Sequence, residues 1–537
     1  MSTPETTELL AQRYGEGYRW WVAATVLVGT ISAVITTTIV NVAIPDIMGA
    51  FGISQDTAAW LSTGALAGTT VAMLMQAWLI VRFGPRRTFL GAMLIFVASL
   101  LVAGFAPNEL VLIIARVVQG CIAGILQPMA IYMMFRVFPD NRKGQAMGMF
   151  GLVSIMGPAI GPYIGGLVIE HFNWRYIFFV GVPTSFVAIL LGAVFMPERE
   201  SLKEDPRAKG AFDSLALVLV STSIALMLIV LSNGQREGWY SNTILGMVAI
   251  SVICGVLFVR RELRSKTPLV DIRPLAVPAF AATAVLSWIF GAGLFGSIYL
   301  VPLFVQTVQG LTPMEAGLLL MPSGLAFGLA MPLTGYLTDR LPARRLILVG
   351  LGIHIVSSLW VAGVDVNTPV LAFAMWVAVG RVGLALVNPA LNVAAMRALP
   401  ATQLGHAAGL INFFRQLGGA FGVNLLTMNL DRGLALHGDA LNAMQSTSNA
   451  TADLLRSVEG LLARAGASVD LQTQGALYYL GQVIEAQAYT QAFRDCFYMV
   501  AFAFILALLP ACMLKRTRPP QAALLNSEKE ARVPESA

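Results

Sequence analysis

Residues 148–167 read GMFGLVSIMGPAIGPYIGGL, a segment apolar enough to lie in a bilayer. Its glycines and prolines form one run: Gly157, Pro158, Gly161, Pro162, Gly165 and Gly166. In a helix, the glycines at four-residue spacing lie near one face, where a neighbouring backbone can come close. The prolines remove main-chain hydrogen bonds, so the helix is expected to bend. The run predicts a membrane helix that presses against a partner and flexes.

The composition places the whole chain in a membrane. Of its 537 residues, 57% are hydrophobic and 12% are charged, and the mean hydropathy is +0.72. A soluble domain cannot keep such an average, because its surface must be polar. A net charge of +6 could indicate a nucleic-acid partner. We expect none, because the basic residues lie in short loops between apolar segments.

About fourteen segments can cross a bilayer, since a spanning helix needs about 20 apolar residues. They are expected at 20–44, 58–80, 88–106, 110–134, 145–169, 175–196, 213–232, 241–260, 279–305, 314–338, 344–363, 368–393, 405–428 and 495–514. Every second loop carries a cluster of Arg and Lys, and the loops between them hold few. By the positive-inside rule, both termini are expected in the cytoplasm.

An internal repeat divides the chain. AWLIVRFGPRR at 77–87 and GYLTDRLPARR at 335–345 align without a gap, and each ends a span. Two copies of a half with about six spans each are typical of secondary transporters. The expected parts are a cytoplasmic N-terminus 1–19, a six-helix bundle 20–196, two linker helices within 197–278, a six-helix bundle 279–514 with an exterior loop 431–494, and a cytoplasmic tail 515–537.

The glycine–proline run resembles the antiporter motif in the fifth helix of major facilitator superfamily drug exporters. The resemblance implies an all-α membrane protein in which this helix seals and hinges two halves. LIIARVVQG at 112–120 resembles the superfamily's RxxQG motif, which implies that Arg116 and Gln119 take part in proton movement. An arginine placed in hydrocarbon costs roughly 2.5–3.5 kcal/mol, which also favours a functional role.

The repeated loop resembles the cytoplasmic gating motif of the superfamily. This implies gating roles for Arg82, Gly84, Arg86, Arg87, Gly335, Asp339, Arg340, Arg344 and Arg345. In the second copy a carboxylate stands among guanidinium groups, where it can form ion pairs in one conformation only. In the first copy Val81 takes the acidic position. The alternative is that these arginines only orient the chain.

Residues 35–47, ITTTIVNVAIPDI, resemble the LDxTIVNVALP signature of fourteen-span drug:proton antiporters, with Thr36 in the acidic position. Threonine does not titrate, and no other Asp or Glu lies in the middle of a span. Proton coupling is therefore expected to use Asp339, a group outside the spans, or the substrate's own charge. The polar residues expected to line a central cavity are Thr36, Thr37, Asn41, Gln127, Gln306, Asn412 and Arg415. Threonine hydroxyls bonded to their own helix are the alternative.

The exterior loop contains TADLLRSVEGLLARAG at 451–466, whose apolar residues share one helical face. This helix either covers the mouth of the transporter or receives an adaptor. The resemblance is to exporters that work with a periplasmic adaptor and an outer-membrane channel, which implies a bacterial inner membrane.

The sequence favours no enzyme. It lacks the phosphate-binding GxxxxGK[ST] loop, which argues against an ATP-driven pump, and its four histidines are not spaced as metal ligands. We expect no cofactor or metal. The expected function is export of amphipathic drugs or toxic small molecules by alternating access, with proton antiport. The alternatives are an exporter of one metabolite or siderophore, an importer, or a non-transporting sensor or scaffold.

Overall fold

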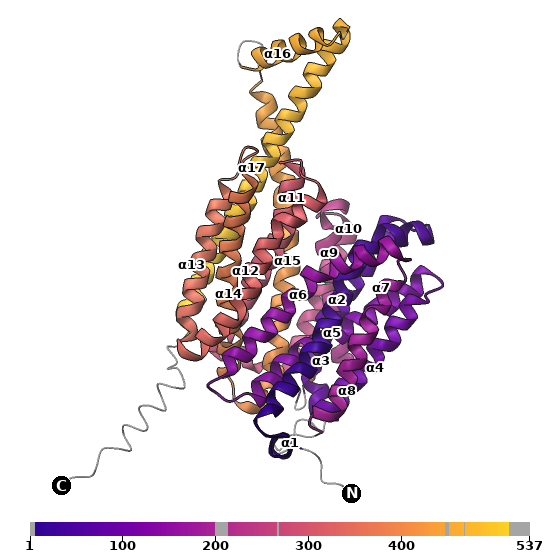
Figure 1. Ribbon diagram of the computed structural model, residues 1–537, viewed down its shortest axis with the longest axis vertical. Coiled ribbons are helices and arrows are strands. Elements are labelled where there is room, and N and C mark those ends of the chain that lie inside the picture. The colour runs from indigo at the N-terminus through magenta and orange to yellow at the C-terminus, as the bar shows by residue number, and fades with distance from the viewer. Residues whose placement is uncertain (1–5, 199–212, 266–267, 446–449, 467, 515–537) are drawn as a thin grey trace, which may run out of the picture.

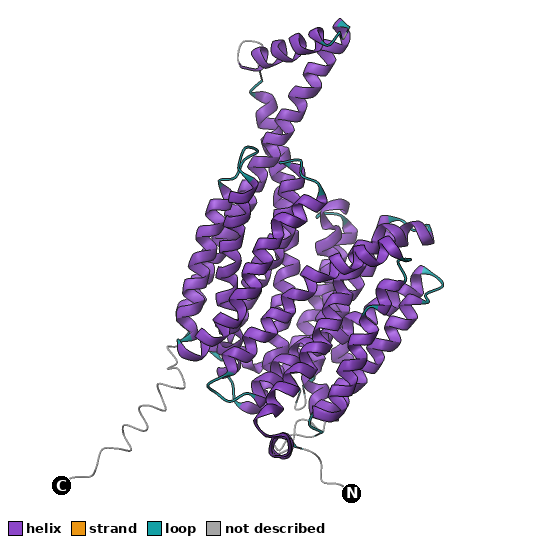
Figure 2. Ribbon diagram, viewed as in Figure 1, coloured by secondary structure: helices purple, strands orange, loops and turns teal. Residues whose placement is uncertain are grey.

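The computed structural model describes residues 6–198, 213–265, 268–445, 450–466 and 468–514. These residues form helices joined by short loops, with no strand among them (Figure 2). A few side chains within the helices, including those of Pro158 and Pro162, lie outside the described part. The bend expected at these prolines therefore stays a prediction.

The first half contains α1 (Thr7–Tyr14), α2 (Tyr18–Phe51), α3 (Gln55–Phe83), α4 (Pro85–Gly104), α5 (Glu109–Val137), α6 (Lys143–His171), α7 (Tyr176–Phe179) and α8 (Gly181–Phe195). Two helices follow, α9 (Ser214–Glu237) and α10 (Asn242–Arg264). The second half contains α11 (Pro278–Thr307), α12 (Pro313–Arg340), α13 (Ala343–Ala362), α14 (Val370–Arg397), α15 (Leu404–Ala443), α16 (Ala450–Arg464) and α17 (Val469–Met513).

Local sequence signals set several helix boundaries. The side chains of Ser54 and Asn108 cap the first turns of α3 and α5. Thr312 and Glu315 form a capping box at the start of α12. Between α3 and α4 the backbone of Gly84 has φ +83°, and a Cβ there would lie 2.1 Å from the carbonyl oxygen of Glu198. Only glycine fits this turn of the first repeated loop.

The protein is a multi-pass membrane protein. Twelve of the described helical segments are long and apolar enough to cross a membrane, and they coincide with expected spans. The other two expected spans, 145–169 and 405–428, form α6 and α15. These two helices pack among the twelve, α6 against α2 and α12, and α15 against α11 and α3.

The two halves stand side by side, with α9 and α10 packed together behind them (Figure 1). Both ends of the described chain lie at one end of the bundle. At the opposite end α15 and α17 continue out of the bundle as an arm, which carries α16 at its tip. The prediction of an amphipathic helix within 451–466 is confirmed, and α16 packs against α17. It lies away from the bundle, not over it.

The glycine face of α6 has a different partner from the expected one. A Cβ at Gly157 would lie 2.3 Å from Cγ1 of Val34, and one at Gly165 would lie 2.8 Å from Cγ1 of Ile39. Both neighbours belong to α2 of the same half. The expectation that this face meets the opposite half is therefore wrong, because these glycines lie on the side of α6 that packs against α2.

Other glycines of α6, nearer its start, make the contact between halves. A Cβ at Gly144 would lie 2.3 Å from the carbonyl oxygen of Gly335, and one at Gly148 would lie 2.6 Å from that of Met331. Both of these partners are in α12. A second contact between the halves joins α15 and α3. A Cβ at Gly409 of α15 would lie 2.7 Å from the carbonyl oxygen of Met73 of α3. Small residues thus let the halves touch at the end where the termini lie.

Candidate functional site: a cavity between the two halves

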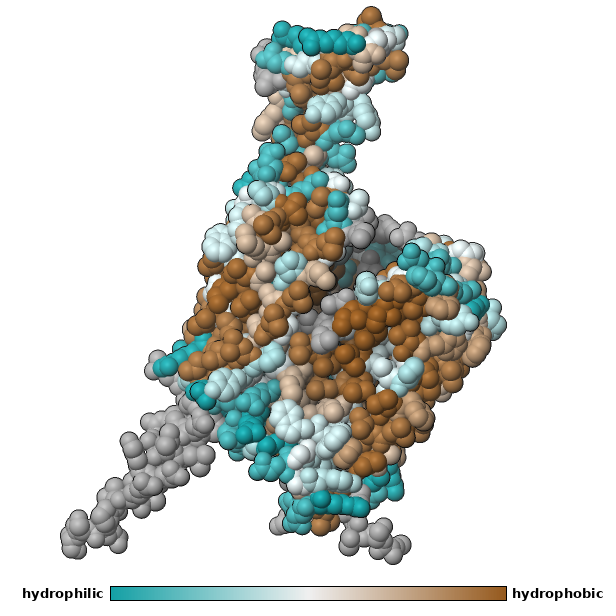
Figure 3. Space-filling model, in the orientation of Figure 1, coloured by the Kyte–Doolittle hydropathy of each residue, from teal (hydrophilic) through white to brown (hydrophobic). Residues whose placement is uncertain are grey.

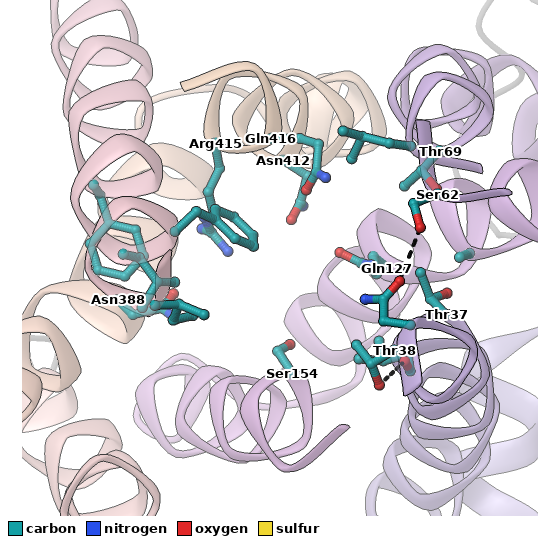
Figure 4. Close-up of a pocket in the computed structure, with 18 of the residues that line it drawn as sticks. Thr37, Thr38, Ser62, Thr69, Gln127, Ser154, Asn388, Asn412, Arg415 and Gln416 are labelled. Carbon is teal, nitrogen blue, oxygen red and sulfur yellow. Dashed lines mark hydrogen bonds between the residues drawn. The ribbon is translucent and has the colours of Figure 1, made fainter. Parts of the chain in front are cut away.

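A cavity of about 510 Å³ lies between the halves. One wall comes from α2, α3, α5 and α6, and the other from α11, α12, α14 and α15. Figure 4 shows Thr37, Gln127 and Ser154 on the first wall, with Asn388 and Arg415 across from them. The molecular surface is hollowed between the halves below the base of the arm (Figure 3). Apolar side chains cover much of the surrounding surface, as expected for contact with lipid.

Arg116 anchors the first wall. Its guanidinium donates to the backbone carbonyls of Leu61, Thr36 and Thr37, at 3.3, 3.3 and 3.2 Å, and to Oε1 of Gln119 at 2.9 Å. Gln119 in turn donates to the carbonyl of Ser99 at 3.2 Å. Since these carbonyls belong to α2, α3 and α4, Arg116 and Gln119 of α5 together connect four helices of the half. Arg116 is 1% exposed and also lines the cavity.

The threonine hydroxyls of α2 bond to carbonyls of their own helix, which was the alternative interpretation. The hydroxyls of Thr36 and Thr37 donate to the carbonyls of Ser32 and Ala33, at 2.8 and 2.7 Å. Thr37 still lines the cavity, whereas Thr36 is buried against α8, where a Cβ at Gly181 would lie 2.6 Å from its hydroxyl. The prediction that Thr36 lines the cavity is therefore wrong, because it lies on the opposite side of its helix.

Gln306 is also absent from the cavity wall. It is the penultimate residue of α11, exposed, and its amide donates to the carbonyl of Pro302 at 3.1 Å. The helix carries it past the cavity toward the end with the arm. The other polar residues predicted from the sequence do line the cavity: Thr37, Asn41, Gln127, Asn412 and Arg415.

The second wall holds a polar chain that sequence reasoning missed in part. Nη2 of Arg415 donates to Oδ1 of Asn392 at 2.7 Å, and Nδ2 of Asn392 donates to Oδ1 of Asn388 at 3.0 Å. Arg415 lies on α15, and both asparagines lie on α14. The signal was available, because two asparagines one turn apart interrupt an otherwise apolar span. Asn388 lines the cavity beside Arg415.

Arg381 separates this cavity from a smaller one. It is 8% exposed and lines both the central cavity and a side cavity of about 30 Å³, which has room for water. His354 also lines the side cavity, and its Nδ1 lies 3.1 Å from the carbonyl oxygen of Gly380. Because a carbonyl only accepts, Nδ1 carries the proton and Nε2 is the acceptor. Further polar residues that sequence reasoning missed are Ser62, Thr69, Ser154 and Gln416.

The walls combine apolar surface with positive charge. Phe290, Phe295 and Phe327 line the second half, and Leu66 and Met73 line the first. Three arginines line the cavity, and none of the described residues around it is Asp or Glu. Such walls suit a molecule with an apolar body and a polar or charged end.

The end of the molecule that carries the termini is held by charged groups. Asp339 is 5% exposed, and its carboxylate accepts hydrogen bonds from the backbone N–H groups of Gly144 and Gln145. Nη2 of Arg397, in the second half, donates to the carbonyl of Asp140 in the loop before α6, at 3.1 Å. A hydrogen bond from Lys143 lowers the pKa of the Asp140 carboxyl.

The ion pairs predicted to form in one conformation only are not made by Asp339 in this one. Within the described chain Asp339 has no ion pair with Arg344 or Arg345, because its oxygens face the start of α6 instead. In the first repeat Arg86 pairs with Glu198 at 3.2 Å, inside one half. The remaining gating arginines are half-buried or exposed at this end: Arg82, Arg87, Arg340, Arg344 and Arg345.

Two bundles that enclose a cavity in a multi-pass membrane protein define a solute transporter. The chain belongs to the Major Facilitator Superfamily, whose family model matches residues 26–423. It is therefore a transporter and not an enzyme.

Named relatives support this assignment. The uncharacterized MFS-type transporter YhcA of Bacillus subtilis is 32% identical over 75% of this chain and 74% of its own length. The multidrug resistance protein B homolog of Mycobacterium tuberculosis is 30% identical over 76% of this chain and 75% of its own length. The multidrug export protein EmrB of Haemophilus influenzae is 28% identical over 89% of this chain and 92% of its own length. The human organic anion transporter MFSD10 shares the fold, with a TM-score of 0.60 at 13% identity over 92% of this chain and 99% of its own.

Proposed function

We propose that the protein is a secondary active exporter of amphipathic drugs or other toxic small molecules, working by alternating access. The observation that carries the proposal is the cavity itself, large, mostly apolar and placed between two halves. The halves touch backbone to backbone at the end with the termini. This arrangement corresponds to one of the two states that alternating access requires. Relatives named for multidrug resistance and export support this direction of transport.

Proton antiport is the proposed source of energy. One charge that moves through about 100 mV yields roughly 2.3 kcal/mol, and each tenfold gradient of a neutral compound costs about 1.4 kcal/mol. One proton therefore supports a gradient of order fiftyfold. Asp339 is the candidate carrier at the closed end, and Arg116 with Gln119 are candidate coupling residues in the first half.

The proposed location is the bacterial inner membrane, with both termini in the cytoplasm. The arm formed by α15, α16 and α17 then projects to the outside. We propose that it receives a periplasmic adaptor, which links the exporter to an outer-membrane channel. We propose the division into 20–196, 197–278 and 279–514, which the two halves and the pair α9 and α10 support.

The test is a susceptibility panel in a bacterial host whose own pumps have been deleted. Expression of the chain is expected to raise resistance to several unrelated amphipathic compounds, and the Arg116→Ala variant serves as an inactive control. Uptake into inverted membrane vesicles then separates export from import, since an exporter fills such vesicles. A chain that changes no susceptibility and fills no vesicle is not an exporter, and a sensor or scaffold becomes the better interpretation.

A further inference from the structure

The central cavity carries charge of one sign. Arg116, Arg381 and Arg415 line it, and an arginine stays protonated in proteins. No described residue of the wall is acidic, and within the described chain none of the three makes an ion pair. The carbonyls that hold Arg116 satisfy its hydrogen bonds and leave its charge uncompensated. The wall therefore repels a cation and attracts an anion.

Two of these arginines have donors to spare. Arg381 is 8% exposed and has no hydrogen-bond or ion-pair partner in the described part of the chain. Nη2 of Arg415 is held by Asn392, while its Nε is buried with no partner among the described residues. Buried donors on a charged group are costly unless an acceptor meets them. Both residues line the cavity, so a ligand in it can supply that acceptor.

The surroundings of Arg415 favour an aromatic or aliphatic body next to the acidic group. Its guanidinium carbon lies 5.7 Å from the ring centroid of Phe290. Phe295 and Phe327 continue the apolar wall on α11 and α12. A planar guanidinium binds a carboxylate, sulfonate or phosphate through two parallel hydrogen bonds.

We propose that the substrate is an amphipathic organic anion, whose acid group is bound by Arg415 and attracted by the charge of Arg381, and whose apolar body lies against the phenylalanines. This inference rests on the proposed export function and names its substrate class. An anionic substrate also needs no titratable proton carrier, which accounts for Thr36 at the position where the resemblance implies an acid. The membrane potential, negative inside, drives an anion outward by itself, and about 100 mV sustains a gradient of roughly fiftyfold.

The test uses purified protein in vesicles of phosphatidylcholine, which contain no anionic lipid headgroup to fill the site. Two radiolabelled aromatic probes are compared: anilinonaphthalenesulfonate, an anion, and ethidium, a cation. A potassium diffusion potential, with no pH gradient, makes the lumen positive for the anion and, in a separate assay, negative for the cation, so that each probe is driven inward equally. We expect accumulation of the anion in preference to the cation, above the level in protein-free vesicles.

The variants locate the site. Arg381→Gln and Arg415→Gln are each expected to weaken accumulation and binding of the anion by about tenfold or more. Arg415→Lys keeps the charge and is expected to retain part of the activity. Arg432→Gln is the matched control, because Arg432 is exposed farther along the same helix. Probe binding to purified variants identifies any loss that comes only from poor reconstitution.

The outcomes separate the two proposals. Preference of the wild type for ethidium, or unchanged anion transport in both glutamine variants, overturns the anion inference and leaves the exporter intact. A wild type that moves neither probe, and no compound of the susceptibility panel, overturns the exporter proposal itself.

Discussion

Oδ1 of Asp339 lies 2.6 Å from the backbone nitrogen of Gly144, across the boundary between the two halves. Oδ2 accepts from the nitrogen of Gln145 at 3.0 Å. These nitrogens belong to the first turn of α6, a helix of 29 residues, where N–H groups have no partner in their own helix. The partial positive charge of a helix start stabilises a carboxylate placed there. Asp339 therefore locks the halves together at this end.

Asp339→Asn is expected to weaken that lock by about 1–2 kcal/mol, since the charge is lost and one N–H group then faces an amide N–H. The population with this end closed should fall by about tenfold relative to the open one. Spin labels at the exposed positions Phe83 and Leu341 report the distance between halves. Asp439→Asn, on the arm, is the control. Unaltered proton-driven efflux in Asp339→Asn would remove Asp339 as the proton carrier.

Gly335→Ala tests the backbone contact itself. The added Cβ would lie 2.6 Å from the carbonyl oxygen of Gly144, so the halves must separate. We expect slower transport and a larger open fraction at this end, measured with the same spin labels. Gly317→Ala on the same helix adds its Cβ to open space and should behave as the wild type. Equal behaviour of both variants contradicts a tight closure.

Gly157→Ala tests the packing of α6 on α2. Its Cβ would lie 2.3 Å from Cγ1 of Val34, whose rotamer is fixed in a helix, so the cost should be about 1–3 kcal/mol. Gly166→Ala meets nothing within 4 Å and should change stability by less than about 1 kcal/mol. Thermal unfolding in detergent compares the two. A Gly157 variant as stable as the Gly166 variant shows that the two helices are not in close contact.

Arg116→Ala should destabilise the first half as well as stop transport. The loss removes four charge-assisted hydrogen bonds and leaves a void, which together cost about 2–4 kcal/mol. A lower unfolding temperature in detergent measures this effect. Arg456→Ala, which breaks an exposed pair with Asp453, should cost less than about 1 kcal/mol. A fully stable but inactive Arg116 variant would assign the residue to coupling alone.

Long apolar segments of the sequence predict the helices well within the membrane and poorly beyond it. The span expected at 314–338 is α12, Pro313–Arg340, and the one expected at 344–363 is α13. The spans expected at 405–428 and 495–514 are parts of longer helices, α15 and α17. Outside the bilayer these helices are polar, so hydropathy carries no signal for their continuation.

The site was predictable where a polar residue interrupts an apolar span, as at Arg116, Asn412 and Arg415. Its partners were not, because Arg116 binds backbone carbonyls, which every residue carries. The orientation of each helix about its axis was not predictable either, because the sequence does not show which side of α2 meets the cavity. Thr36 and Thr37 are neighbours, and only Thr37 lines it.

The arm is continuous with the second half, because α15 and α17 each run from the bundle into the arm as one helix. Helices of 40 and 45 residues are about 60 and 68 Å long. A small rotation of the second half therefore becomes a larger displacement of α16, as at the end of a lever. In the proposed alternating-access cycle, a protein bound to the tip would be displaced once in each turnover, and the cycle would be transmitted as mechanical motion beyond the membrane.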